Sequence, residues 1–246
     1  MTERLLEVQA TAEDWSAQEL LAWAAREFGE KAALASSFGA EDVVLIDIAS
    51  RINAPFVVFT LDTNFLFPET YELISEIEGK YGISVEHVRP RLNPESQARE
   101  FGDELWRQRP DLCCELRKVE PLTQRLRASS AWITGIRREQ SPTRANARKL
   151  EWDAKFGIVK LNPIADWTEG QVWEYIRSRA VPYNPLHAIG YPSIGCTHCT
   201  RAVLPGEDPR AGRWSGFSKT ECGLHVVETE DGPRLAPAQS AGAAGR

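Results

Sequence analysis

AALASSFGAEDVVLIDIASR, residues 32–51, is the stretch that decides the fold of this chain. It begins with small apolar residues, which are typical of a short buried strand. The residues SSFGAED then have the small and polar character of a turn, and the apolar residues after them recur at helical spacing, which predicts a helix over 41–51. A strand, a turn and a helix in direct succession indicate one unit of a parallel α/β sheet.

The sequence on either side repeats this alternation. Further strands are expected at 56–62, 84–88, 131–137 and 157–164, and further helices at 17–28, 68–82 and 168–181. Two of the helices begin with capping-box patterns, Ser16 with Glu19 and Thr168 with Gln171. We therefore predict an α/β fold whose parallel sheet carries helices on both faces. Ligands bind such sheets at the carboxyl ends of the strands, so the site is expected in those turns.

The regular pattern ends at about Val181, where Pro, Gly, Cys and aromatic residues take over. This change predicts three parts: an α/β core over 1–180, a loop-rich C-terminal lid over 181–227 and a disordered tail over 228–246. The tail is expected to be disordered because it is small, polar and rich in Pro and Gly.

Composition narrows the class of protein. The opening MTERLLEVQATAEDWS is not a secretory signal, and no apolar run reaches the length of a membrane helix. A net charge of −6 argues against a nucleic-acid partner. Five cysteines without an export signal favour free thiols in a reducing compartment. We expect a cytoplasmic protein without a membrane partner; the sequence leaves open whether it forms a homo-oligomer.

The turn Ser36-Ser37-Phe38-Gly39-Ala40-Glu41-Asp42 is a candidate phosphate site. Small residues let backbone N–H groups approach a phosphate, and the following helix N-terminus adds partial positive charge. The turn lacks the GxxxxGK[ST] pattern of a P-loop. An ordinary glycine-containing turn explains the same residues equally well.

Two other predicted strand ends carry polar residues. The second strand ends in Leu61-Asp62-Thr63-Asn64, and the fourth is followed by Arg137 and Arg138, with Ser141 and Arg144 beyond them. Arginines can clamp phosphate or sulfate with two hydrogen bonds. A solvated charged loop is the alternative, but three strand ends that meet at one sheet edge favour an anionic nucleotide.

Four cysteines form a CC pair and a CxxC pair, Cys113-Cys114 and Cys196-Thr197-His198-Cys199. Four thiolates from two distant segments indicate a metal site. Zinc needs all four sulfurs around one atom, whereas a cubane offers a separate iron to each thiolate, which suits adjacent cysteines better. An iron–sulfur cluster is favoured over zinc, and His198 is expected in the lid beside the site rather than among its ligands.

The fifth cysteine, Cys222, stands near Lys219 and His225. A thiol close to such groups can act as a nucleophile of lowered pKa. A tail thiol without a function is an equally good interpretation of this residue alone.

Taken together, SSFGAEDVVL, LDTNFLFPETY, CCELRKVEPL, GIRREQSPTR, CTHC and ECGLH resemble the assimilatory adenosine 5'-phosphosulfate (APS) reductases of the sulfonucleotide reductase family. The resemblance extends over about 32–225 and implies an adenine-nucleotide fold related to the PP-loop proteins. It also implies that Cys222 attacks the sulfate sulfur of APS, expels AMP and forms S-sulfocysteine, from which a separate thioredoxin releases sulfite.

The resemblance further implies the site residues. One [4Fe–4S] cluster per subunit is expected on Cys113, Cys114, Cys196 and Cys199. The expected substrate contacts are Ser36, Ser37, Gly39, Asp42, Leu61, Thr63, Lys118, Arg137, Arg210, Arg213 and His225. Lys118 matches a family lysine between cluster and substrate.

Two features depart from the family pattern. Asn64 stands where LDTG has glycine, which leaves the effect on that turn open, and QSPTR is one residue shorter than QSPxTR, which leaves the alignment of Arg144 open. Three alternatives remain. A 3'-phosphoadenosine 5'-phosphosulfate (PAPS) reductase typically lacks the four cluster cysteines; a tRNA-thiolating PP-loop enzyme leaves ECGLH unexplained; and a zinc-stabilised nucleotide-binding module would have no catalysis.

Overall fold

The computed structural model describes residues 3–217, 219, 221, 223 and 224. Across this part of the chain, no helix is both long enough and apolar enough to cross a membrane.

One mixed sheet forms the centre of the described structure. Its strands are β1 (Ala32–Ala35), β2 (Val57–Leu61), β3 (Glu86–Val88), β4 (Ala131–Ile133), β5 (Leu150–Asp153) and β6 (Ile158–Leu161). They lie in the order β3-β2-β1-β4-β6-β5. The strands from β3 to β6 pair in parallel, as predicted, and β5 pairs antiparallel with β6. The sequence analysis missed β5. A short turn is enough to join antiparallel neighbours, so this edge hairpin needs no intervening helix.

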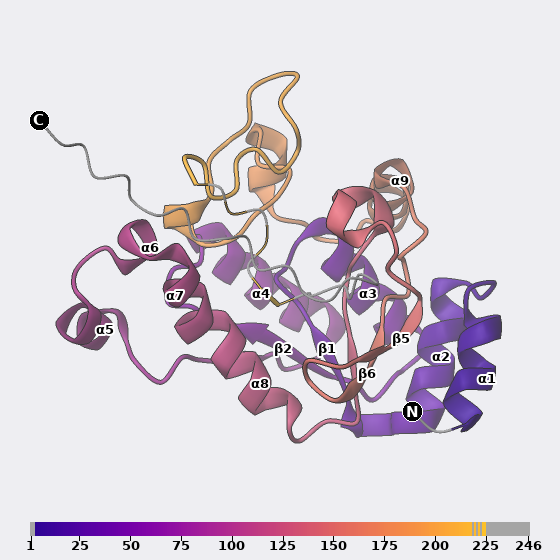
Figure 1. Cartoon of the computed structure of the whole chain (residues 1–246). Helices are drawn as coiled ribbons and strands as arrows, with labels where there is room; N and C mark the ends of the chain where they lie inside the picture. The colour runs from indigo at the N-terminus through magenta and orange to yellow at the C-terminus, as the bar shows by residue number, and fades with distance from the viewer. Residues whose placement is uncertain (1–2, 218, 220, 222, 225–246) are drawn as a thin grey trace, which may run out of the picture.

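Helices cover both faces of the sheet. The α-helices are α1 (Glu3–Ala12), α2 (Ala17–Phe28), α3 (Ala40–Arg51), α4 (Pro68–Tyr81), α5 (Pro94–Phe101), α6 (Leu105–Gln108), α7 (Pro110–Cys114), α8 (Glu120–Leu126) and α9 (Glu169–Arg179). Figure 1 shows α7 and α8 in front of the sheet and α3 and α4 behind it. One core joins α2, α3, α4 and α9 to the sheet, and a second joins α8 to the other face.

The alternation of side chains in β1 explains the two cores. Ala32 and Leu34 belong to the larger core, whereas Ala33 belongs to the smaller one beneath α8. A strand that is buried on both faces must be apolar throughout, which is why AALA shows no polar alternation.

Local signals in the sequence set the helix ends. Both predicted capping boxes are present, Ser16 with Glu19 at α2 and Thr168 with Gln171 at α9. Gly82 ends α4 in the left-handed conformation with φ of 64°, which glycine adopts without strain. The segments α1, α5, α6, α7 and α8 were not predicted.

A single helical path runs from α7 through a π-helical turn, Glu115–Val119, into α8. The π turn follows Cys113 and Cys114 directly and contains Lys118. Such turns insert one extra residue into a helix and are frequent at functional sites.

After α9 the described residues form loops with short 3₁₀ turns, the irregular orange segment of Figure 1. Isolated bridges between Leu66 and Cys196 and between Thr200 and Arg213 tie these loops together and to the residues after β2. The predicted tail, 228–246, lies outside the described residues.

Candidate functional site

A cavity of about 300 Å³ opens at the carboxyl ends of β1, β2 and β4, and loops that follow α9 close it. Every predicted substrate contact among the described residues lines it: Ser36, Ser37, Gly39, Asp42, Leu61, Thr63, Lys118, Arg137, Arg210 and Arg213. His225, the remaining one, lies outside the described residues. The structure therefore brings together the turns that the sequence placed at one sheet edge. We call this space the nucleotide cavity.

The turn after β1 is shaped by its own side chains. The backbone N–H of Ser37 and its hydroxyl both donate to Asp42 Oδ2, at 2.6 and 2.8 Å, and Phe38 N–H donates to Ser36 Oγ at 3.0 Å. Gly39 then caps the N-terminus of α3. Burial raises the pKa of Asp42 to about 6, although the bonds from Ser37 oppose this shift.

The turn after β4 packs closely on this loop through Gly135. A Cβ at that position would lie 2.5 Å from Asp42 Oδ1 and 2.9 Å from the Cβ of Glu41. Real Cβ atoms do not approach so closely, so only glycine lets β4 deliver Arg137 to the N-terminus of α3.

Arg137, which the sequence predicts to bind an anion, forms ion pairs with two carboxylates of the protein. Its Nε donates to Glu41 Oε1 at 2.8 Å, and its Nη1 is ion-paired with Glu139. The guanidinium is buried among these partners. The structure thus places Arg137 at the cavity with a large part of its donor capacity engaged.

Arg144 and Arg210 hold a carboxylate that the sequence analysis did not single out, that of Glu221. Arg144 donates to it through Nε at 3.1 Å and Nη2 at 3.0 Å, and Arg210 Nη2 lies 3.3 Å from it. The hydroxyls of Ser141 and Thr143 each lie 3.4 Å from the same carboxylate. We call this set of four residues the carboxylate cradle. Glu221 belongs to the ECGLH motif, but the sequence analysis assigned functions only to Cys222 and His225 of that motif.

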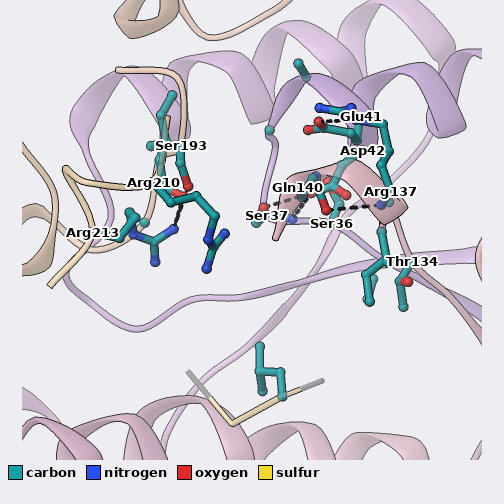
Figure 2. Close-up of a pocket in the computed structure, with 18 of the residues that line it drawn as sticks. Ser36, Ser37, Glu41, Asp42, Thr134, Arg137, Gln140, Ser193, Arg210 and Arg213 are labelled. Carbon is teal, nitrogen blue, oxygen red and sulfur yellow. Dashed lines mark hydrogen bonds and ion pairs between the residues drawn. The ribbon is translucent and has the colours of Figure 1, made fainter. Parts of the chain in front are cut away.

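Arg213 also lines the nucleotide cavity, and contacts with the loop residues before it hold it in place. Its Nη1 donates to Ser193 Oγ at 3.1 Å and to the carbonyl oxygen of Ile194 at 3.2 Å. A Cβ at Gly195 would lie 2.4 Å from Arg213 Nη2, so a side chain there would displace the guanidinium from this position. Figure 2 shows Arg210 and Arg213 on one side of the cavity and the turn of Ser36 and Ser37 on the other.

A second, smaller cavity is lined by the cysteines of both predicted pairs, Cys113, Cys114, Cys196 and Cys199. We call it the cysteine cavity. The loop after β2 holds the lid pair in place: Cys196 Sγ lies 3.3 Å from Thr63 Oγ1, and Thr197 N–H donates to the Phe65 carbonyl at 2.8 Å. Tertiary structure thus joins segments that are more than eighty residues apart.

Burial is the main influence on the pKa values of these thiols. Burial and the neighbouring cysteines raise the pKa of Cys113 to about 12 and that of Cys199 to about 11. Thiolates in this cavity therefore need bound positive charge. Among the described residues, no three His, Cys, Asp or Glu side chains are arranged to hold a single metal ion. Four cysteine thiols are a donor set that zinc and iron–sulfur clusters both take.

Lys118 and Trp214 line both cavities. The charges of Lys118 and Arg213 also oppose the rise in the pKa of Cys199. The two cavities are therefore neighbours, with Lys118 between them.

Aromatic residues surround His198 in the cysteine cavity. Its ring stacks on Trp106 at a centroid distance of 4.5 Å and meets the edge of Phe65 at 4.8 Å. Burial lowers the pKa of His198, which favours the neutral ring.

Asn64, the departure from LDTG, retains the backbone that glycine would adopt. Its φ is 60°, a left-handed value that Asn tolerates better than most other residues. Its Oδ1 also lies 3.4 Å from Nη1 of Arg117. The substitution therefore preserves the turn and adds a polar contact.

Cys222 lies outside the described residues, but its neighbours border the nucleotide cavity. Glu221 and Leu224 line that cavity. Lys219 is ion-paired with Asp111, at the start of α7. Glu221, the residue before the candidate nucleophile in the sequence, thus lines the predicted site.

Comparisons with known proteins agree with this geometry. A family model described as the phosphoadenosine phosphosulfate reductase domain matches residues 31–202. The adenosine 5'-phosphosulfate reductase of Shouchella clausii is 49% identical, over 87% of this chain and 89% of its own. Adenosine 5'-phosphosulfate reductase 2 of Bacillus subtilis is 48% identical, over 84% and 88%. The crystal structure of the phosphoadenylyl-sulfate (PAPS) reductase of Candida auris, a phosphate complex, aligns with a TM-score of 0.72 at 31% identity, covering 82% of this chain and 98% of that one.

Proposed function

The chain belongs to the phosphoadenosine phosphosulfate reductase family, and from this premise we propose that it reduces APS to sulfite and AMP with electrons from thioredoxin. It is an oxidoreductase that acts on a sulfur group, as its relatives at 48–49% identity are. The observation that carries the proposal is the meeting of three features: the phosphate-binding turn, the lid arginines and a cysteine cavity that shares Lys118 with them.

The first step takes place on Cys222. Its thiolate attacks the sulfate sulfur of APS, an S–S bond forms, and the bond between that sulfur and the bridging oxygen breaks. AMP leaves with the electron pair, and the enzyme holds S-sulfocysteine. Lys118 and Arg213, which line the cavity, are placed to stabilise the negative charge that develops on the oxygens.

The second step regenerates the enzyme. A thioredoxin thiolate attacks the sulfur of Cys222, and sulfite leaves with the electron pair of the S–S bond. The second thioredoxin thiol resolves the mixed disulfide and restores the Cys222 thiol. The dithiol supplies the two electrons of the reduction, so the reaction balances without another reductant. Thioredoxin is kept reduced in the cytoplasm, which is where we place the enzyme.

We further propose a [4Fe–4S] cluster on Cys113, Cys114, Cys196 and Cys199. Support comes from their shared cavity and from thiol pKa values that demand a positive partner. When bound, the cluster would supply a charged centre beside Lys118. The residues of the chain then have distinct tasks: Thr63 and Phe65 hold the lid pair, and Lys118 faces both cavities.

Intact-protein mass spectrometry tests the mechanism. After incubation with APS and without thioredoxin, we expect one added sulfo group, mapped to Cys222, which thioredoxin removes as sulfite. Cys222→Ser should bind AMP normally yet form no adduct, because a hydroxyl is a far poorer nucleophile than a thiolate. A Cys222→Ser enzyme that reduces APS at the wild-type rate would refute the mechanism.

The same preparation decides between the proposal and its alternatives. We expect about four iron and four sulfide per chain, and a kcat/KM higher for APS than for PAPS. Stoichiometric zinc without sulfide would favour the zinc-stabilised module. A kcat/KM for PAPS equal to or above that for APS would favour a PAPS reductase.

A further inference from the structure

Three aromatic rings meet at the wall of the cysteine cavity. Phe65 follows β2, Trp106 belongs to α6, and His198 stands in the CTHC segment of the lid. The rings of His198 and Trp106 are stacked, with centres 4.5 Å apart and planes 8° from parallel. The ring of Phe65 lies at 75° to that of His198, with the centres 4.8 Å apart. We call these three residues the aromatic cover.

The aromatic cover lies between the cysteine cavity and solvent. All three of its residues line the cavity, yet His198 is exposed and the other two are only partly buried. Cys113, Cys114 and Cys196, which line the same cavity, are each at most 8% exposed. A side chain that lines a cavity and also reaches the surface is part of the wall that separates the two.

The same rings close the seam between two parts of the fold. Phe65 and Trp106 come from segments beside the sheet and before α7, whereas His198 comes from the lid. Thr197 N–H donates to the Phe65 carbonyl at 2.8 Å, so the backbone holds the lid beside Phe65. The His198 ring then extends the contact to Trp106. Rings stacked at this distance touch each other, so water does not pass between them.

A metal centre bound by thiolates depends on such a wall. Iron held by sulfur is lost when oxygen or a chelator reaches it, and the apolar shell around a metal site controls that access. In this chain the shell is completed by a contact between lid and helix, and not by residues of one segment alone.

We propose that the stacked pair of Trp106 and His198 seals the cysteine cavity at the seam between lid and helix, and so protects a bound iron–sulfur centre from oxygen and chelators. This inference rests on the proposed function, because it requires a loaded cysteine cavity. Trp106 and His198 are then shielding residues that neither bind substrate nor hold metal.

The test is made on the anaerobically purified, iron-loaded enzyme. Trp106→Ala, which opens the stack, should lose its visible cluster absorption about 10- to 100-fold faster than wild type, both in air and with a chelator, the usual size of effect when the surroundings of a metal site are altered. Trp106→Phe keeps a ring in the seam and should stay close to wild type. AMP affinity should be unchanged in both variants, because Trp106 does not line the nucleotide cavity.

Variants of His198 distinguish shielding from metal binding. His198→Phe keeps a ring but cannot hold metal, so it should retain its iron and lose it at the wild-type rate. His198→Ala should lose the cluster as fast as Trp106→Ala does. Because the two rings form one stack, the double variant should lose its cluster no faster than the faster of the two single variants.

Trp23→Ala is a matched control. Trp23 lies on α2 and also packs on an aromatic ring, that of Phe28 at a centroid distance of 5.5 Å, but it lines neither cavity. It removes the same side chain from another part of the fold and should leave the rate of cluster loss unchanged. Where Trp106→Ala does not give soluble protein, Trp106→Leu removes the ring with more of its volume kept and should show the same acceleration.

The outcomes separate the two proposals. Wild-type protein without iron and sulfide contradicts the proposed cluster. Wild-type protein that holds the cluster, with Trp106→Ala or Trp106→Leu and His198→Ala unchanged in cluster loss, overturns the aromatic seal alone. His198→Phe without iron also overturns it, because His198 would then be a ligand. Equal acceleration in Trp23→Ala overturns it as well, because the effect would then follow from general destabilisation.

Discussion

Because Gly135 has no Cβ, the turn after β4 can pack directly against the N-terminus of α3 and so shape one wall of the nucleotide cavity. The turn after β4 approaches Asp42 and Glu41 so closely that a Cβ would overlap both. This contact brings the N-terminus of α3, the turn of Ser36 and Ser37, and Arg137 into one wall of the nucleotide cavity.

Gly135→Ala should therefore weaken AMP binding and destabilise the protein by about 1–3 kcal/mol, the usual range for overpacking a tight contact. Calorimetric titration with AMP and thermal unfolding measure the two effects. Gly170→Ala is the control, because a Cβ there meets no atom closer than 3.8 Å. An unchanged AMP affinity in Gly135→Ala would contradict the importance of this contact.

We expect Asp42 to make ligand binding in the nucleotide cavity sensitive to pH. Because burial raises its pKa to about 6, the folded protein binds this proton more tightly than the unfolded chain does. Protonation at Asp42 thus stabilises the fold as pH falls, and this contribution is lost as pH rises through about 6. The neutral acid also repels a phosphate less than the carboxylate does.

We expect the AMP affinity of wild type, divided by that of Asp42→Asn, to decrease as pH rises from about 5 to about 7, the range around this raised pKa. The ratio cancels the titration of AMP itself. Binding titrations across that range measure it. A flat ratio would show that Asp42 does not titrate beside the ligand.

At the scale of elements, Glu221 lies outside any helix or strand and is held by charged and polar side chains. Glu221 lies in the carboxylate cradle of Arg144, Arg210, Ser141 and Thr143. Hydrogen bonds between charged groups contribute about 1.5–3 kcal/mol each, enough to dock a short tail. The same arginines line the nucleotide cavity, so Glu221 and the proposed substrate would share them as partners.

Glu221→Gln should slow formation of the Cys222 adduct by roughly 10- to 100-fold, because one charge-assisted contact is lost. AMP affinity should be equal or higher, since the arginines are released. Quenched-flow mass spectrometry measures the rate. Glu207→Gln is the control, because Glu207 forms a comparable bidentate pair with Arg201 outside the lining of the nucleotide cavity. Equal rates in both variants would contradict the docking role.

At the scale of the whole molecule, the cysteine cavity lies where the lid meets the helices that cover the sheet. Cys113 and Cys114 belong to the helical path that covers one face of the sheet, whereas Cys196 and Cys199 belong to the lid. A metal centre shared by both would fix the lid over the nucleotide cavity. Its loss should therefore affect lid and helix together.

Cys113→Ser and Cys196→Ser should each lose iron and sulfide, and both should expose the lid to protease near residues 200–210. Limited proteolysis with iron analysis tests this expectation. Cys222→Ser is the matched control and should keep its iron and its resistance. Iron loss in Cys113→Ser without a change in lid cleavage would show that the lid is held by its protein contacts alone.

The sequence by itself determined the elements that have strong local patterns. Capping residues, helical periodicity and the apolar AALA run predicted α2, α3, α4, α9 and the parallel strands, because these signals act within a few residues. The residues that the family pattern predicted as substrate contacts line the nucleotide cavity wherever the structure describes them.

Tertiary structure decided what depends on contacts distant in sequence. Three features have no local sequence pattern, because each depends on residues distant in the chain. They are the antiparallel strand β5, the carboxylate that Arg144 binds, and the donors of Arg117 that lack a partner among the described residues. No motif marks a carboxylate that binds an arginine 77 residues earlier, or a guanidinium left without an anion. An unpaired charge is costly only when it is buried, and burial exists only in the packed fold. The fold therefore shows which charged groups have partners within the described chain and which do not.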